Sequence, residues 1–240
     1  MELSSLVAVF GHPDDESLAA GGILARHAAA GARTAVVTAT WAPSTQRAAE
    51  LAEALRILGA GEPRLLGYAD AKAPESAPGR PRWCDVPLDE AVHRLVVQIR
   101  EFRPEALVTF DALGGLTGHP DHVQTHRVTV LAAEAAGLDI HPDAGRPWAP
   151  SAVYLATHPL TSVETIEQIV GARRAVNATP DEDVTDRVDV SPWLEQKVAA
   201  ILAHRSEVDR GALPGLVARL SPIDRQALLS TEWFIRRPAR

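Results

Sequence analysis

The amino-acid sequence predicts an α/β protein with a Rossmann-like, three-layer fold built around a mostly parallel central sheet. Short apolar runs alternate with longer segments of helical periodicity through most of the chain, which is typical of a doubly wound sheet with right-handed crossovers. Several of these runs end in a cluster of polar residues. Open α/β sheets bind ligands beyond the carboxyl ends of their strands, so the pattern also predicts where a functional site lies.

Five apolar runs, followed by a late strand or hydrophobic anchor around Trp233, are the predicted strands. Their β-branched residues favour the pleated conformation. The predicted strands cover residues 6–10, 34–40, 64–68, 106–110 and 151–157. The last residues, 236–240, are expected to fray.

Helices are predicted where apolar residues recur at intervals of three and four. Gly31 and Gly59 each follow such a segment, where they would act as C-terminal caps. Gly21 and Gly22 lie inside the first helix; because glycine costs about 1 kcal/mol per residue there, we expect close packing against a strand or a ligand. The predicted helices cover residues 17–30, 45–58, 89–102, 120–136, 161–169 and 191–206.

The segments between these elements are predicted as loops. Residues 71–87 are dense in proline, alanine and charge and predict a long surface loop, a kind of segment that often forms a lid or a binding loop. The acidic run 181–183 predicts a solvated loop. Residues 185–189 predict a polar approach to the last long helix, and residues 211–214 break the chain again.

Length and composition favour a single domain spanning residues 1–240. The chain has 46% hydrophobic and 23% charged residues, which is ordinary for a globular protein with a substantial core. Its net charge of -7 and its lack of a basic block argue against nucleic acid or an anionic membrane as the partner. Homo-oligomerisation is left open.

Cysteine usage and the N-terminus bear on redox chemistry and location. Cys84 is the only cysteine, which excludes an intrachain disulfide and any C-x-x-C motif. The first residues carry no basic segment, and the apolar run after them is too short for a signal peptide or a membrane span. We therefore expect a cytoplasmic protein.

The first predicted strand ends in the sequence His-Pro-Asp-Asp-Glu at residues 12–16. One or two of these acids could simply cap the following helix. Three adjacent acids, however, repel one another unless a cation or a proton shares the space, and a histidine beside carboxylates is a common set of zinc ligands. We therefore interpret this turn as part of a site.

A second group of unusual residues follows the fourth predicted strand, where a glycine-rich turn leads into Gly-His-Pro-Asp-His at residues 118–122. Catalytic zinc sites use three protein ligands and leave a fourth position for water. If the two loops face each other, His12, Asp15 and His122 supply such a set, and Asp14 could take a proton from the water. A pair of His122 and His126, one helical turn apart, is an alternative that leaves His12 unexplained.

These two motifs together resemble the PIG-L/LmbE family of zinc-dependent de-N-acetylases. Further similarity lies in residues 47–50 (Arg-Ala-Ala-Glu), in residues 67–70 (Gly-Tyr-Ala-Asp) and in the late segment 197–206. The resemblance extends from about residue 5 to residue 207. The two histidine motifs are specific in combination, whereas either one alone would not be.

The resemblance implies a role for each residue of the motifs. Zinc would be bound by His12, Asp15 and His122, with Asp14 as the general base. His119, oriented by Asp121, would steady the oxyanion or protonate the leaving amine. Arg47 and Asp70 would contact a sugar substrate. Ligand sets of histidine and aspartate accept Fe²⁺ as well as Zn²⁺, so the metal in cells is left open.

Three positions depart from the family pattern. Trp41 lies where members usually carry a Thr-x-Gly-Glu type of turn, and it could stack on a sugar or cover the core. Thr117 replaces a tyrosine found in some members, so oxyanion help from a phenol is absent or comes from elsewhere. Glu207 replaces a frequent glutamine, which would make that part of the pocket more acidic.

The leading hypothesis is a zinc-dependent hydrolase that removes an N-acetyl or other N-acyl group from a 2-amino sugar in a small glycoside or glycoconjugate. The alternatives are an amidase of a larger amino-sugar conjugate and a non-catalytic sugar-binding module. The chain contains no Gly-x-Gly-x-x-Gly turn and no Gly-x-Ser-x-Gly elbow, which argues against a nucleotide-binding module and a serine hydrolase. His158 could line the pocket, although a satisfied surface position is the commoner case. The other histidines are expected to be structural or solvated: His27, His93, His141 and His204.

Overall fold

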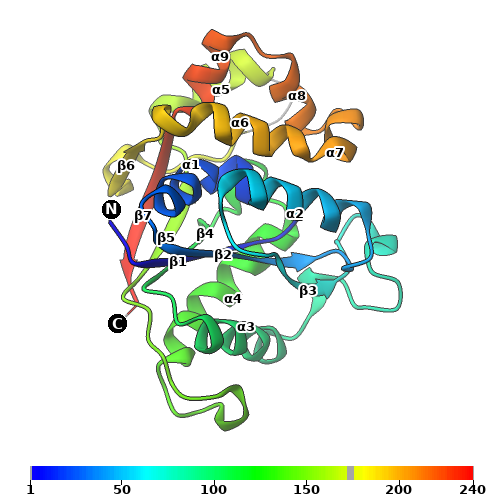
Figure 1. Ribbon diagram of the computed structural model, residues 1–240, viewed down its shortest axis with the longest axis vertical. Helices are drawn as coiled ribbons and strands as arrows, with labels where there is room; N and C mark the ends of the chain where they lie inside the picture. Colours follow the sequence, from blue (N-terminus) through cyan, green and yellow to red (C-terminus); the bar gives the residue numbers. More distant parts are fainter. Residues whose placement is uncertain (1, 172–175, 240) are drawn as a thin grey trace.

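The computed structural model describes residues 2–171 and 176–239. Within these ranges seven strands form one sheet in the order β3-β2-β1-β4-β5-β7-β6 (Figure 1). The first five strands run parallel to their neighbours, and β7 is antiparallel to both β5 and β6. The strands are β1 (Ser5–Phe10), β2 (Arg33–Thr40), β3 (Arg64–Tyr68), β4 (Ala106–Phe110), β5 (Ala152–Thr157), β6 (Asp186–Asp189) and β7 (Thr231–Pro238).

Helices cover both faces of the sheet. On one face lie α1 and α2 with α6 packed against both, and on the other lie α3 and α4 (Figure 1). The helices are α1 (Asp15–Ala29), α2 (Gln46–Leu58), α3 (Leu88–Phe102), α4 (Pro120–Ala136), α5 (Val163–Val170), α6 (Leu194–Ala203), α7 (Arg205–Asp209), α8 (Leu213–Arg219) and α9 (Pro222–Leu229). None of the helices in the described part of the chain is long and apolar enough to cross a membrane.

The alternation of side chains along β1 explains the three layers. Leu6, Ala8 and Phe10 belong to the core cluster under α1 and α2, whereas Val7 and Val9 belong to the cluster under α3 and α4. Successive side chains of a strand point to opposite faces of the sheet. Because both faces of β1 are covered, the strand is apolar throughout, as parallel strands in α/β proteins are. The predicted fold class is confirmed.

The first 160 residues agree with the predicted elements to within two residues at each end. Gly59 adopts a left-handed conformation at the end of α2, where its N–H bonds to the carbonyl groups of Arg56 and Leu55. An added Cβ on Gly22 would lie 2.4 Å from the Cβ of Val190, just beyond β6. The predicted close packing at the glycine pair of the first helix is therefore confirmed, with Val190 as the neighbour.

The C-terminal part differs from prediction. Residues 186–189, predicted as part of a polar approach to the next helix, form the short strand β6. The predicted helix 191–206 is interrupted at His204 between α6 and α7. Helices α8 and α9 follow the predicted break. The expected fraying of residues 236–240 is wrong up to Pro238, because β7 continues along β5 in the pairs Tyr154 with Arg236 and Ala152 with Pro238. Residue 240 lies outside the described residues.

The predicted surface loop 71–87 is pinned to the body of the protein. It contains the 3-10 turns Pro74–Ser76 and Trp83–Asp85. Trp83 is only 1% exposed, and its Nε1 donates to Thr125 Oγ1 of α4 at 2.9 Å. The loop therefore has a fixed position against α4, close to the residues described next.

Candidate metal and catalytic site

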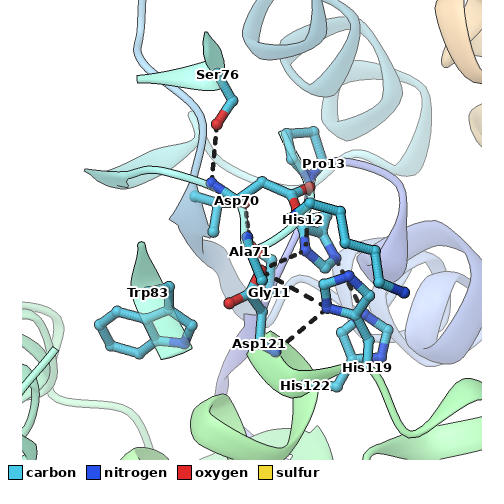
Figure 2. Close-up of polar contacts among 12 residues, drawn as sticks. Gly11, His12, Pro13, Asp70, Ala71, Ser76, Trp83, His119, Asp121 and His122 are labelled. Carbon is cyan, nitrogen blue, oxygen red and sulfur yellow. Dashed lines mark hydrogen bonds and ion pairs between the residues drawn. The ribbon is translucent and has the colours of Figure 1, made fainter. Parts of the chain in front are cut away.

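The two histidine-containing loops meet because the strands that carry them are neighbours. β1 and β4 pair in parallel, with Leu6 opposite Ala106, so the turns after both strands lie at the same edge of the sheet. Figure 2 shows His12 of the first turn together with His119 and His122 of the second. The sequence-based expectation that these loops face each other is confirmed.

Three ligand atoms form a compact triangle in this site. His12 Nδ1 lies 3.0 Å from His122 Nε2, and Asp15 Oδ2 lies 3.3 Å from each of these nitrogen atoms. Zinc bonds of about 2.0–2.2 Å in tetrahedral geometry place neighbouring donor atoms about 3.3–3.6 Å apart. The three residues are each 7% exposed. Two of the three separations match this range and the third, 3.0 Å, is shorter. The donor chemistry, two imidazole nitrogens and one carboxylate oxygen, fits a zinc ion.

The remaining ring nitrogen of each of the two histidines is held by an acceptor. His122 Nδ1 lies 3.1 Å from the carbonyl oxygen of Gly114. His12 Nε2 lies 3.1 Å from Asp121 Oδ2 and 3.4 Å from Asp70 Oδ2. A ring N–H that donates to such acceptors leaves the lone pair of the other nitrogen available, which is the usual arrangement for metal-binding histidines.

Asp121 anchors His12 and also reaches the loop that follows β3. Its carboxylate, which is fully buried, accepts the N–H group of Ala71 at 2.9 Å (Figure 2). It also accepts the N–H group of Cys84 at 3.0 Å. The carboxylate lies 3.7 Å from His119 Nδ1, farther than from His12. The backbone N–H of Asp121 instead donates to His119 Nδ1 at 3.2 Å. Asp121 therefore orients His119 mainly through its backbone, which leaves the ring hydrogen on Nε2.

The charges around His12 favour a cation. Burial lowers the pKa of His12, but its bonds to Asp121 and Asp15 and the charge of Asp70 outweigh burial and raise it to about 10. Burial raises the pKa of Asp15, yet the nearby His122 and His12 bring it well below its usual range. Burial lowers the pKa of His119 to about 4, and the adjacent imidazoles act in the same direction. This cluster of carboxylates stabilises a positive charge, which a metal ion would also supply.

Asp14 lies next to the ligand triangle in an unusual conformation. Its backbone φ of 130° is in a region that residues other than glycine rarely adopt. The residue is only 8% exposed. Burial raises the pKa of its carboxyl to about 7, although Arg47, whose guanidinium lies 3.2 Å away, opposes the shift. The Asp14 N–H donates to Glu16 Oε2 at 3.0 Å, which helps to hold this conformation.

The predicted sugar contacts border the site, but they already have protein partners. Arg47 donates to the carbonyl of Pro13, pairs with Asp14 and Glu207, and stacks 4.6 Å above the ring of Trp41. It is 5% exposed. Trp41 is half-buried, and Asp70 lies against His12. The structure thus brings all nine predicted site residues into one region, with Arg47 less accessible than expected.

Other ligand combinations are present in the described residues. One group consists of His12, His119 and His122, and another of His12, Asp70, His119 and Asp121. In each group, one nitrogen or oxygen atom per residue lies within 4.8 Å of the corresponding atoms of all the others. His126, the alternative ligand, belongs to neither group, and its Nδ1 is bonded to the Phe110 carbonyl oxygen at 2.9 Å.

Two histidines have environments that sequence analysis did not resolve. His204 is fully buried, with Nε2 2.9 Å from Glu16 Oε1, so it supports the turn that contains Asp14. The only signal for it was its place in the late family-like segment. His158, for which a satisfied surface position was favoured, is half-buried and lines a cavity, and its Nδ1 has no hydrogen-bond partner in the described part of the structure.

An α/β sheet with a buried group of histidine and aspartate residues that could hold a metal ion at its carboxyl edge defines the class of protein. The model of the PIG-L family, described as GlcNAc-PI de-N-acetylase, matches residues 7–133. The 1D-myo-inositol 2-acetamido-2-deoxy-alpha-D-glucopyranoside deacetylase of Rhodococcus jostii (strain RHA1) is 36% identical over 265 residues, covering 96% of this chain and 90% of that protein. The chain belongs to the PIG-L family, as its two motifs indicated.

Solved structures support the fold assignment. The N,N'-diacetylchitobiose deacetylase of Pyrococcus horikoshii matches with a TM-score of 0.70 at 19% identity, over 99% of this chain and 85% of that one. The 4-carboxy-2-hydroxymuconate hydratase of Pseudomonas putida KT2440 matches with a TM-score of 0.61 at 18% identity, over 98% and 96% of the two chains. Since the second protein is named as a hydratase, the fold alone does not select a reaction.

Proposed function

We propose that this chain is a metal-dependent N-deacetylase that hydrolyses the N-acetyl group of a 2-amino sugar in a small glycoside. The observation that carries the proposal is the triangle of His12, Asp15 and His122 ligand atoms, with sides of 3.0–3.3 Å, beside the buried carboxyl of Asp14. Relatives along nearly the whole chain are named as deacetylases of an acetylglucosaminyl inositol, which supports this substrate class.

The residues divide the work of amide hydrolysis. Zinc held by the three ligands would polarise an amide carbonyl and make hydroxide available near neutral pH. The Asp14 carboxylate accepts the proton of the attacking water, which is general base catalysis. The Nε2–H of His119 donates to the oxygen that becomes negative in the tetrahedral state. Acetate and a protonated amine are the products.

The sugar is proposed to bind on the side of Arg47, Asp70 and Trp41. Arg47 pairs with Asp14 and stacks on Trp41, so a sugar hydroxyl that reaches the guanidinium lies close to the proposed base. Of the two metals that such ligands accept, we propose zinc, because two histidines and one carboxylate, with a position left for water, are a known ligand set of catalytic zinc. Octahedral coordination would require further ligands or waters.

Acetate release from N-acetylglucosaminides tests the proposal. Chelator-stripped protein is assayed alone, with Zn²⁺, and with Fe²⁺ under anaerobic conditions, against acetylglucosaminyl inositol and simpler glycosides. We expect release to return with stoichiometric Zn²⁺ and to be absent from Asp14→Ala loaded with the same metal. Release that returns only with Fe²⁺ would overturn the choice of metal. Absence of release from every glycoside, despite stoichiometric metal, would contradict the deacetylase function.

A further inference from the structure

A cavity of about 100 Å³ adjoins the ligand triangle. It lies between α1, the loop after β4, the end of β5, and helices α8 and α9, which Figure 1 shows on the same side of the sheet as α1 and α6. Asp15 and His122 contribute to its wall. Among the described residues, Arg47, Asp70 and Trp41 do not line it.

The wall of this cavity is mainly apolar. Six large apolar side chains converge on it while remaining only half-buried in the protein: Leu18, Leu116, Leu213, Leu216, Leu228 and Trp233. Apolar side chains that keep partial exposure around a concave space are typical of ligand pockets. The site therefore offers an occupant a hydrophobic surface directly beside two of the proposed metal ligands.

The buried ion pair and one threonine of the wall are already engaged, whereas His158 Nδ1 has no hydrogen-bond partner in the described part of the structure. Lys197 Nζ pairs with Glu232 Oε1 at 2.7 Å, and this carboxylate also accepts the N–H groups of Gly22 and Ile23. Thr157 Oγ1 bonds to Asp111 Oδ2 at 2.6 Å. The ion pair is buried and carries no net charge. An apolar occupant would therefore leave neither the ion pair nor the threonine unsatisfied.

We propose that this cavity is an acyl chamber that admits N-acyl groups a few carbons longer than acetyl; the inference rests on the proposed hydrolysis of an N-acyl amino sugar. The carbonyl carbon of the amide is bonded on one side to the nitrogen of the sugar and on the other side to the first carbon of the acyl chain. With the sugar toward Arg47, the acyl chain extends toward Asp15 and His122, where the cavity opens. An apolar cavity of about 150 Å³ accommodates benzene, so the present volume suits a chain of about four carbons.

The acyl-length dependence of hydrolysis tests this chamber. Zinc-loaded enzyme is assayed on one glucosaminide carrying N-acetyl, N-butyryl or N-hexanoyl groups. Because an apolar chamber can bury the added methylenes favourably, we expect kcat/KM for N-butyryl to equal or exceed that for N-acetyl. Leu228→Trp, which fills the chamber from α9, should lower kcat/KM for N-butyryl at least tenfold more than for N-acetyl.

A matched control and a second variant keep the test decisive. Ile223 is on the same helix, is 80% exposed and does not line the cavity. Ile223→Trp should therefore leave kcat/KM unchanged for both the N-acetyl and the N-butyryl substrate. Leu216→Phe fills the chamber from α8 and serves if Leu228→Trp does not fold. The chamber is refuted if N-acetyl is hydrolysed but N-butyryl is over 100-fold slower, or if folded filling variants affect both equally. Inactivity on all three substrates would instead refute the proposed function together with the chamber.

Discussion

The part of the chain up to residue 157 and the part from residue 176 onward make different contributions to the same site. The first part forms the parallel strands and carries all nine predicted site residues, either on the turns that follow these strands or in the first residues of the next helices. The second part forms the antiparallel edge and the short helices, and supplies buried partners and the outer wall of the cavity. Reactive groups thus come from regular strand ends, and the surroundings that hold them come from irregular structure.

The two parts are joined by polar contacts that reach the turn containing Asp14. His204 bonds to Glu16, whose other oxygen accepts the N–H of Asp14. Glu207 pairs with Arg47, which in turn pairs with Asp14. Both connections begin at the junction of α6 and α7 and end at the proposed base. We infer that the first part determines whether the reaction occurs and the second part determines its efficiency.

The largest expected effect tests the proposed metal ligands of the first part. His122→Ala removes one corner of the ligand triangle, so stoichiometric zinc and deacetylase activity should both be lost. His126→Ala, one turn later on α4, removes only a hydrogen bond to the Phe110 carbonyl and should retain zinc. Metal content is measured by elemental analysis after dialysis. Full retention of zinc by His122→Ala would move the third ligand to another residue, such as His119.

The next effect separates the proposed base from the ligands. Asp14→Ala should keep stoichiometric zinc while kcat falls by about 10²–10⁴-fold, the usual contribution of a general base. Asp143→Asn, a charge-removing change at an exposed carboxylate of the same part, should leave kcat unchanged. Metal content and steady-state rates are measured on the same samples. If Asp14→Ala loses its metal, Asp14 is a ligand, and its assignment as the base is wrong.

Much of the first part could be predicted because its signals are local. Residues 12–16 follow an apolar strand directly, so their position at the sheet edge follows from the order of residues alone. The contact of His12 with Asp121 and Asp70 could not be predicted, because it depends on how the pinned loop after β3 approaches α4. The pairing of β1 with β4 could be expected only if both strands were central.

The second part gave weaker or misleading signals. β6 has four residues of which only Val188 is buried, so its apolar pattern is too short to identify a strand. Pro214 and Gly215 argue against a helix by propensity, yet they lie in the first turn of α8, where proline is tolerated. α9 did carry a recognisable start, since Ser221 caps it by accepting the Asp224 N–H at 3.1 Å. His204 has no local signal for its pairing with Glu16.

A third prediction concerns the buried ion pair that attaches β7 to α6. Lys197→Met leaves the Glu232 carboxylate buried without its cation, and removing one partner of such a pair costs about 3–5 kcal/mol of unfolding free energy. Denaturant unfolding of chelator-stripped protein measures the loss. Glu53→Gln breaks an exposed pair with Arg56 and should not change stability measurably. If Lys197→Met abolished zinc binding while remaining folded, a residue of the second part would be needed for metal binding. The inferred division of roles between the two parts would then be wrong.

The smallest expected effect is a pH dependence at the His204–Glu16 contact. Burial disfavours the imidazolium, but the charge of Glu16 outweighs it and raises the pKa of His204 above its usual 6.5. Burial also raises the pKa of Glu16, but His204 outweighs it and brings that pKa below its usual 4.5. Because the pKa of His204 is higher in the folded protein, its charge stabilises the fold fully below pH 6.5. This stabilisation is lost as pH rises through the folded-state pKa. Because the pKa of Glu16 is lower in the folded protein, its charge stabilises the fold fully above pH 4.5. This stabilisation is lost as pH falls through the folded-state pKa of Glu16.

His204→Gln keeps a hydrogen-bond donor but removes the charge, so it isolates this contribution. The difference in unfolding free energy between wild type and His204→Gln should be about 1–2 kcal/mol near pH 5.5, the extra strength of a charged over a neutral hydrogen bond. It should shrink as pH rises beyond the raised pKa of His204 and again as pH falls below 4.5. Both proteins are compared without metal, so the titration of the proposed metal ligands, which both proteins share, cancels in the difference. A difference that stays constant from pH 5.5 to 9 would mean that His204 is neutral in the fold and contributes by packing alone.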